Sequence, residues 1–417
     1  MTERLSLRKN LLFHTAGSLY YLICQWLMNV VAVRLGSYEV GGWLSLAVTV
    51  TGFFYALISF GSRIYQVSDT KGQYSPSLYI STRILTTLAG TAACCLFVLC
   101  NRRYAPIQAW SIVLYMLFKC SESLVDVLAA EEQKAWRLDW AGVSYVLRGT
   151  LSLGGLMLGL ALGLSLPVAL LWTAGLALAV VLLYDVPKVR RLTGFRVHLS
   201  LRESGPLLRA TLPAMLNAAL MVLLAAIPRY LLEYTWGSES LGIYTAIAAP
   251  AVIVQAGCSF IYSPLVAPLS EQYHAGELRG FVRQLGYSAL AAAGLLALLL
   301  GGAAWLGDWG LRLIFTDSIA PYTWMLIPAL LSAFCSAMIY YLDVPLTILR
   351  HQRQMTWIHA GACAVALLAS LWLIPRLGIF GVNVVLYIAA GGDALALLGM
   401  LMLLLRREQN RSKEGNR

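Results

Sequence analysis

Three ionisable side chains lie within residues 109–130, a stretch that is otherwise apolar enough to cross a membrane. Lys119, Glu122 and Asp126 follow one another at helical spacing, which places them on one stripe roughly 60° wide. A charge at the centre of a bilayer costs on the order of 3 kcal/mol, so it faces protein or water rather than lipid. The stretch therefore predicts a spanning helix with one polar face, where an ion or a charged substrate could bind.

Arg148 is a second cation inside an apolar stretch, residues 141–163. It lies about 12 Å along that helix at 1.5 Å per residue, and Glu122 is expected at a similar depth. Pairing of Arg148 with Glu122 or Asp126 is therefore geometrically allowed. Two interpretations stay open. The pair could be a salt bridge that only fastens two helices, or it could line a hydrated cavity that binds an anionic group or carries protons.

Two further arginines lie near the ends of apolar stretches. Arg63 is expected at headgroup level, where its side chain could simply reach the interface or could hold a lipid phosphate with its planar fork. Arg229 directly follows a proline, and Glu233 lies four residues further on. An ion pair along one helix is therefore the alternative to a binding role for Arg229.

Enzymatic, cofactor and metal sites have no signature in this sequence. It contains no Walker A, G-x-S-x-G, H-E-x-x-H or GxGxxG pattern. Its eight cysteines form no CxxC pair and no metal-ligand spacing with histidine, so they are expected to be free thiols that pack as small apolar side chains. We therefore predict no catalytic residue, no cofactor and no metal site, and a protein that is not an enzyme.

Membrane-spanning helices are needed to position these charges. Of the 417 residues, 59% are hydrophobic and only 12% are charged, and the mean hydropathy is +0.71, which indicates an all-α polytopic membrane protein. A spanning helix needs about 20 mainly apolar residues. Twelve segments qualify: residues 11–33, 41–62, 79–100, 109–130, 141–163, 166–186, 207–231, 241–263, 286–306, 322–342, 356–374 and 380–405.

The basic residues assign the two sides of the membrane. Of 31 Lys and Arg residues, 23 lie in the termini and one set of loops, among them Arg83 in the loop 63–83. Five lie in the opposite loops, and three lie inside spans. Because cytoplasmic loops are enriched in Lys and Arg, both termini are predicted to be cytoplasmic. The same bias explains the net charge of +11, so no nucleic-acid partner is expected.

The predicted spans divide into two sets of six. The turn GSYEVGGW (36–43) has a counterpart in GSESLGIY (237–244), at the same place in the second set. Such a repeat predicts two bundles related by an axis along the membrane normal. The expected parts are an N-terminal six-helix lobe, a basic cytoplasmic linker, a C-terminal six-helix lobe and a cytoplasmic tail. Their ranges are residues 1–186, 187–206, 207–405 and 406–417.

Four stretches carry a resemblance to a known superfamily. They are RIYQVSD (63–69), PRYLLE (228–233), LGIYTAIAAP (241–250) and LGDWGLRLIFTDSIAPY (306–322). With twelve spans in two sixes, the chain resembles the multidrug/oligosaccharidyl-lipid/polysaccharide (MOP) exporter superfamily. Within it, the chain is similar to the polysaccharide-transport branch, the flippases for O-antigen, capsule or exopolysaccharide repeat units.

The resemblance implies a MATE-like fold, with two lobes around a central cationic cavity in the bacterial cytoplasmic membrane. It implies a flippase that takes an undecaprenyl-diphosphate-linked oligosaccharide from the inner leaflet and releases it outside by alternating access. The expected partners are this lipid-linked substrate, membrane lipids and a coupling ion, H⁺ or Na⁺. The expected substrate-binding residues are Arg63, Lys119, Arg148 and Arg229, and Glu122 and Asp126 are the expected coupling or charge-pairing acids.

Three alternatives remain. A cation-coupled drug antiporter of the same fold would need an essential acid, for which Glu122 and Asp126 are the candidates. A lipid II-type flippase is disfavoured by the span count. Such flippases usually have two extra spans and arginines in the first span, whereas this chain has twelve predicted spans and only His14 in the first. A membrane scaffold that transports nothing would need none of the buried charges.

Overall fold

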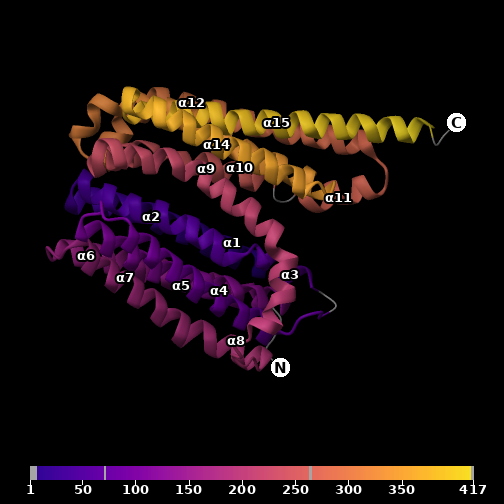
Figure 1. Cartoon of the computed structure of the whole chain (residues 1–417), viewed down its shortest axis with the longest axis horizontal. Coiled ribbons are helices and arrows are strands. Elements are labelled where there is room, and N and C mark those ends of the chain that lie inside the picture. Colours follow the sequence, from indigo (N-terminus) through magenta and orange to yellow (C-terminus); the bar gives the residue numbers. More distant parts are fainter. Residues whose placement is uncertain (1–6, 70–71, 263–264, 415–417) are drawn as a thin grey trace. The chain divides into compact units, whose positions relative to one another are not determined.

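The structure, a computed structural model, describes residues 7–69, 72–262 and 265–414. Within these ranges the chain is helical, with short connections and no strand. The chain forms two compact units, Met1–Val222 and Leu223–Arg417. Each unit is a bundle of long helices (Figure 1).

The first unit contains the chain up to the first part of α9. Its elements are α1 (Leu7–Val31), the π-turn η1 (Ala32–Gly36), α2 (Tyr38–Ser59), α3 (Ser62–Ser68), α4 (Pro76–Cys100), α5 (Pro106–Lys134), α6 (Leu138–Ala161), α7 (Leu166–Val180), the π-turn η2 (Val181–Asp185), α8 (Val186–Thr193) and the start of α9 (Leu201–Ala248). Helices α4, α5 and α7 each have a proline in the first turn. Proline is favourable there, because the N–H groups of the first turn make no hydrogen bond within the helix.

Helix α5 is the central helix of the first unit. It packs against α2, α4, α6 and α7, and also against the short helices α3 and α8. Its apolar side chains Met116, Phe118 and Val125 are fully or almost fully buried. Because neighbours surround α5, the charges that it carries face protein, which satisfies the requirement for ionisable groups inside a membrane.

Two glycines bring α1 and α6 into close contact. A Cβ atom at Gly17 would collide with the backbone of Gly142, and a Cβ atom at Gly142 would collide with the backbone of Phe13. Small residues allow such close approach of helices inside membranes. The close approach places Tyr21 of α1 next to Arg148 of α6.

A sharp turn separates α2 from α3. Phe60 and Gly61 both have a positive φ, of 51° and 57°. Helix α9 packs against the end of α2 next to this turn. Met215 and Ala219 of α9 form a small apolar core with Ala56 of α2. The predicted second span runs to residue 62, but α2 ends at Ser59 and the chain then turns into α3.

The second unit contains the remainder of α9 and the helices that follow. They are α10 (Ala251–Tyr262), α11 (Val266–His274), α12 (Leu278–Ile314), the 3₁₀ turn η4 (Asp317–Met325), α13 (Leu326–Ile348), α14 (Gln352–Leu377) and α15 (Ile379–Glu414). Helix α15 packs along α14 (Figure 1). It also packs along α13, and α10 packs on α13. Gly237, with φ of 83°, interrupts α9, and Gly36 ends η1 just before α2. Both glycine–serine turns of the proposed repeat therefore coincide with helix breaks.

Ten helices of the described residues are long and apolar enough to cross a membrane. Helix α5 has the length but not the composition, because of its charged residues. The predicted span 241–263 is divided between the end of α9 and the twelve-residue α10. The structure therefore confirms an all-α, multi-spanning chain, while the count of twelve and the cytoplasmic termini stay predictions.

Candidate functional site

The charged stripe of α5 begins with a close ion pair. Lys119 Nζ lies 2.5 Å from Glu122 Oε2, and the two side chains are 16% and 13% exposed. The same ammonium lies 5.4 Å from the centre of the Tyr55 ring and 5.6 Å from that of Tyr115, within cation–π range. Lys119 is thus held by one carboxylate and two aromatic faces, yet it keeps some access to solvent.

Tyr21 joins Glu122 to Arg148. The Tyr21 hydroxyl donates to Glu122 Oε1 at 2.5 Å and accepts from Arg148 Nη2 at 3.0 Å. The predicted association of Arg148 with Glu122 is therefore realised through a tyrosine from the first helix. Arg148 is 1% exposed, and its guanidinium lies 4.9 Å from the centre of the Tyr21 ring.

Asp126 binds two arginines that lie on other helices. Its Oδ1 is 3.2 Å from Arg63 Nη1, and its Oδ2 is 3.0 Å from Arg83 Nη2. The Arg83 side chain is 1% exposed and also donates to Ser62 Oγ at 2.8 Å. The charge pattern predicts Arg83 in a cytoplasmic loop, but it lies buried in α4. Asp126 thus has Arg63 and Arg83 as its ion-pair partners, and the alternative pairing with Arg148 is replaced by them.

These contacts define the first-unit charge network. Its members form two groups on the stripe of α5. Asp126 binds Arg63 and Arg83, and Glu122 binds Lys119 directly and Arg148 through Tyr21. The network holds four cations and two carboxylates. Buried Asp185, which accepts from Ser144 Oγ at 2.9 Å, also interacts with Arg148 and lowers the surplus by one. Positive charge remains in excess.

The members of the network differ in what they can reach. Arg63 has the most accessible side chain, 28% exposed, and also donates to the Tyr145 hydroxyl at 3.5 Å. Lys119 is less exposed, while Arg83 and Arg148 are enclosed by protein. In this conformation Arg63 and Lys119 can contact an anion, whereas Arg83 and Arg148 hold the carboxylates in place.

Arg229 lies in the second unit, whereas the other three predicted cations lie in the first. Its guanidinium is 5.9 Å from the centre of the buried Tyr244 ring, and its Nε has no hydrogen-bond partner. Glu233, the predicted i,i+4 partner, accepts a hydrogen bond from Ser238 Oγ at 3.3 Å.

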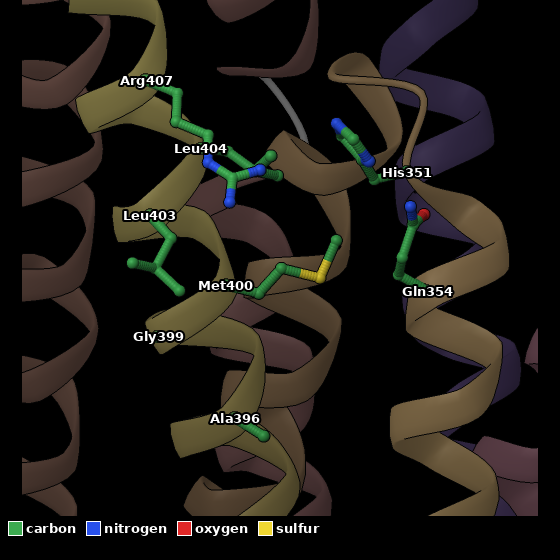
Figure 2. A pocket seen from close by; sticks show the side chains of 8 residues that line it. All are labelled: His351, Gln354, Ala396, Gly399, Met400, Leu403, Leu404 and Arg407. Atoms are coloured by element: carbon green, nitrogen blue, oxygen red, sulfur yellow. The ribbon is translucent and has the colours of Figure 1, made fainter.

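A groove of about 480 Å³ opens in the second unit at the end of α15. Figure 2 shows its walls: His351 and Gln354 lie on one side, and Arg407 lies on α15 on the other. Ala396 and Gly399 are the smallest residues of the α15 wall. None of the predicted site residues lines this groove.

Residues 7–274 match a protein family described as "Polysaccharide biosynthesis protein", and this match covers well over half of the chain. The chain belongs to the polysaccharide biosynthesis protein family. A curated relative is the capsular polysaccharide biosynthesis protein CapF of Staphylococcus aureus, which is 27% identical over 251 residues. The match covers 59% of this chain and 61% of CapF, so the chain spans about three fifths of the length of that relative.

Solved structures of MOP-superfamily transporters share the fold of this chain. The lipid II flippase MurJ in an inward closed conformation aligns with a TM-score of 0.73 at 12% identity, over 94% of this chain and 87% of MurJ. An inward-facing multidrug resistance MATE transporter of the MOP superfamily aligns with a TM-score of 0.68 at 10% identity, over 95% and 96% of the two chains. At such low identity these similarities show the fold alone.

The family and the fold confirm two predictions, the resemblance to the polysaccharide-transport branch and the MATE-like fold class. They also agree with a multi-spanning membrane protein. The sequence did not predict Tyr21, Arg83 and Tyr145 as members or neighbours of the site. Only Arg83 carried a signal, because it falls inside the predicted span 79–100.

Proposed function

We propose that this chain is a flippase for lipid-linked oligosaccharide repeat units in surface polysaccharide synthesis. The substrate would be an undecaprenyl-diphosphate-linked oligosaccharide, and the chain would move it across the bacterial cytoplasmic membrane by alternating access. Family membership supports the pathway class. The observation that carries the substrate class is the surplus of cations in the first-unit charge network.

A diphosphate suits that surplus. A partly buried cation without a matching anion is costly in a membrane, and an anionic ligand removes this cost when it binds. Arginine presents several donors in a planar fork that fits phosphate oxygens, and lysine adds a compact point charge. Arg63 and Lys119 are therefore the residues for which we propose direct contact with the diphosphate.

Arg148 has a supporting role in the proposed mechanism rather than direct contact with the diphosphate. Because it is enclosed, its role in this conformation is to fix Tyr21 and, through Tyr21, Glu122. Glu122 in turn orients Lys119. Arg229 is the cation of the second unit that we propose for the same substrate, because its Nε is buried without a hydrogen-bond partner.

The drug antiporter alternative requires an acid that is available to a cationic drug or to a coupling cation. Glu122 is held by Lys119 and Tyr21, and Asp126 is held by Arg63 and Arg83. Both acids are thus occupied by cations of the protein itself, which argues against this alternative. A lipid II-type substrate also carries a lipid diphosphate, so the charge network suits it equally and the sugar must be tested directly.

The test is complementation of a deletion strain with Arg63→Ala, Lys119→Ala or Arg229→Ala. We expect surface polysaccharide to fall while the amount of protein in the membrane stays normal. Arg312→Ala is the matched control, because Arg312 is 44% exposed and pairs with Asp308 four residues earlier. Normal export by all three variants would overturn the cationic-site proposal. Altered drug susceptibility without loss of polysaccharide would favour the antiporter, and lysis with loss of cell wall would favour lipid II.

A further inference from the structure

A histidine in the second unit lies between two carboxylates. His359 of α14 places Nδ1 2.8 Å from Asp393 Oδ2 of α15, and Nε2 3.3 Å from Asp343 Oδ1 of α13. The His359 and Asp393 side chains are 1% and 0% exposed, whereas that of Asp343 is 17% exposed. Three neighbouring helices thus bring three ionisable groups into one buried row, with one end open to solvent.

The two contacts of the imidazole differ in quality. The contact with Asp393 is a hydrogen bond. The contact with Asp343 has an ion-pair distance but lacks hydrogen-bond alignment, so Nε2 has no hydrogen-bond partner. Asp393 Oδ1 is also buried without a partner. The row therefore contains fully enclosed polar atoms that can accept or donate a further proton.

The charges of this row are incompletely balanced. A neutral imidazole has one N–H, so it can donate to only one of its two carboxylates, while an imidazolium can donate to both. Even with an imidazolium the row carries one net negative charge. Neither carboxylate has a Lys or Arg within salt-bridge distance in residues 7–69, 72–262 and 265–414.

The other titratable groups that face the row do not supply the missing charge. Cys363 of α14 interacts with Asp393, and Tyr340 of α13 and Tyr262 of α10 interact with Asp343. Thiols and phenols are neutral at physiological pH, so they add no cation. With a neutral imidazole the row carries two negative charges, and each bound proton removes one of them, which favours proton binding in an apolar environment.

We propose that Asp343, His359 and Asp393 form a proton-binding site of the second unit, loaded from solvent through Asp343. A proton from water would first bind the Asp343 carboxylate. When that side chain rotates into line, its proton would pass to His359 Nε2 while the Nδ1 proton passes to Asp393 Oδ2. One proton thereby moves from solvent to the buried carboxylate, and the imidazole changes tautomer without a net change in charge.

A metal ion fits this arrangement poorly. The two carboxylates lie at opposite edges of the imidazole ring, because each faces a different ring nitrogen. A single ion therefore cannot bind one ring nitrogen and both carboxylates together. The part of the chain that the structure describes holds no group of His, Cys, Asp and Glu arranged for metal binding.

The direct test counts bound protons. The purified full-length protein in lipid nanodiscs would be titrated between about pH 5 and pH 8 in weak buffer with a pH-sensitive dye. We expect the protein to bind at least one more proton per chain than Asp393→Asn or His359→Gln. The control Asp308→Asn changes an exposed acid that pairs with Arg312, and its proton count should equal that of the wild type.

Asp343→Asn tests the direction of loading. Its proton uptake after a rapid drop in pH should be at least tenfold slower, and Asp343→Glu should restore the rate. Size-exclusion profiles check that each variant is folded, and the conservative Glu variant keeps the test valid if the Asn variant misfolds. Equal proton counts in the wild type, Asp393→Asn and His359→Gln would overturn the proposal.

Use of this proton for transport rests on the flippase function proposed above. In proteoliposomes, a proton gradient should accelerate translocation of the lipid-linked oligosaccharide by the wild type and should have no effect on Asp393→Asn. Absence of any translocation by the wild type would refute the flippase function. The proton count would then still decide whether the proton-binding site exists. Translocation that responds equally to the gradient in both proteins would refute the coupling role.

Discussion

Asp126 allows a comparison of two arginines that share one partner. Arg63 and Arg83 bind its two carboxylate oxygens at nearly equal distances, but their side chains are 28% and 1% exposed. We predict that Arg83→Ala mainly lowers stability, whereas Arg63→Ala mainly lowers substrate affinity. Both variants delete a guanidinium that binds Asp126. Any difference between them therefore separates the loss of a structural salt bridge from the loss of a binding residue.

The expected magnitudes follow from burial. Removing one partner of a buried ion pair costs about 3 to 5 kcal/mol, and because Asp126 keeps Arg63 we expect Arg83→Ala to cost about 3 kcal/mol. Arg63→Ala leaves Asp126 bound to the enclosed Arg83, so its cost in stability should be about 1 kcal/mol or less. A hydrogen bond to a charged group contributes about 1.5 to 3 kcal/mol, so losing the contact of Arg63 with a phosphate should weaken binding tenfold to about 100-fold.

The assay combines thermal unfolding of the purified variants with binding of undecaprenyl diphosphate. Arg83→Ala should unfold at a clearly lower temperature than the wild type, and Arg63→Ala should unfold close to it. Arg63→Lys keeps the charge without the fork and should bind with intermediate affinity. Equal destabilisation by the two alanine variants, or unchanged binding by Arg63→Ala, would contradict the division of roles between the two arginines.

Three further predictions test the framework that holds the network. Gly142→Ala should cost about 1 to 3 kcal/mol and lower the membrane yield, because its Cβ would meet the backbone of α1, whereas Gly154→Ala, which has open space, should be tolerated. Tyr21→Phe should lower the unfolding temperature without changing the charge, since it removes both hydrogen bonds of the bridging hydroxyl. Asp69 should make stability depend on pH. Burial raises the pKa of its carboxyl, but hydrogen bonds from the amides of Gln73 and Tyr74 outweigh the effect of burial. The pKa therefore lies below the ordinary value of 3.8. The stabilisation by Asp69 is therefore complete above that value and is lost as the pH falls through the lowered pKa, so Asp69→Asn should destabilise the protein near neutral pH but not in strong acid.

The apolar helices and the fold class could be predicted from sequence because the bilayer imposes a length and a composition on each span. Helix ends were less predictable. The second span ends at Ser59 because Phe60 and Gly61 turn the chain, and positive φ at a phenylalanine has no sequence signature. The eighth predicted span is divided between α9, which ends at Ala248, and α10, which begins at Ala251. The composition stays apolar across this break, so hydropathy does not reveal it.

Pairing of the charges was the least predictable part. Depth counting found that Arg148 and Glu122 lie near each other, but it could not reveal that Tyr21 stands between them. Loop counting assigned Arg83 to the cytoplasmic surface, because a count along the chain does not show which face of α4 meets α5. Asp343 and Asp393 are 50 residues apart in sequence, and only the packing of α13, α14 and α15 brings both to His359.

The arrangement around Asp126 also bears on how a ligand could exchange with the network. A phosphate that binds Arg63 competes with Asp126 for the same guanidinium, because Arg63 Nη1 contacts Asp126 Oδ1. Asp126 would not become an isolated buried charge in that event, since Arg83 stays bound to its other oxygen. A carboxylate held by a single arginine would lose its partner to the ligand, at a cost of about 3 to 5 kcal/mol. The second, enclosed arginine therefore makes Arg63 available to an anion at low cost, and this is the physical reason for assigning substrate contact to Arg63 and support to Arg83.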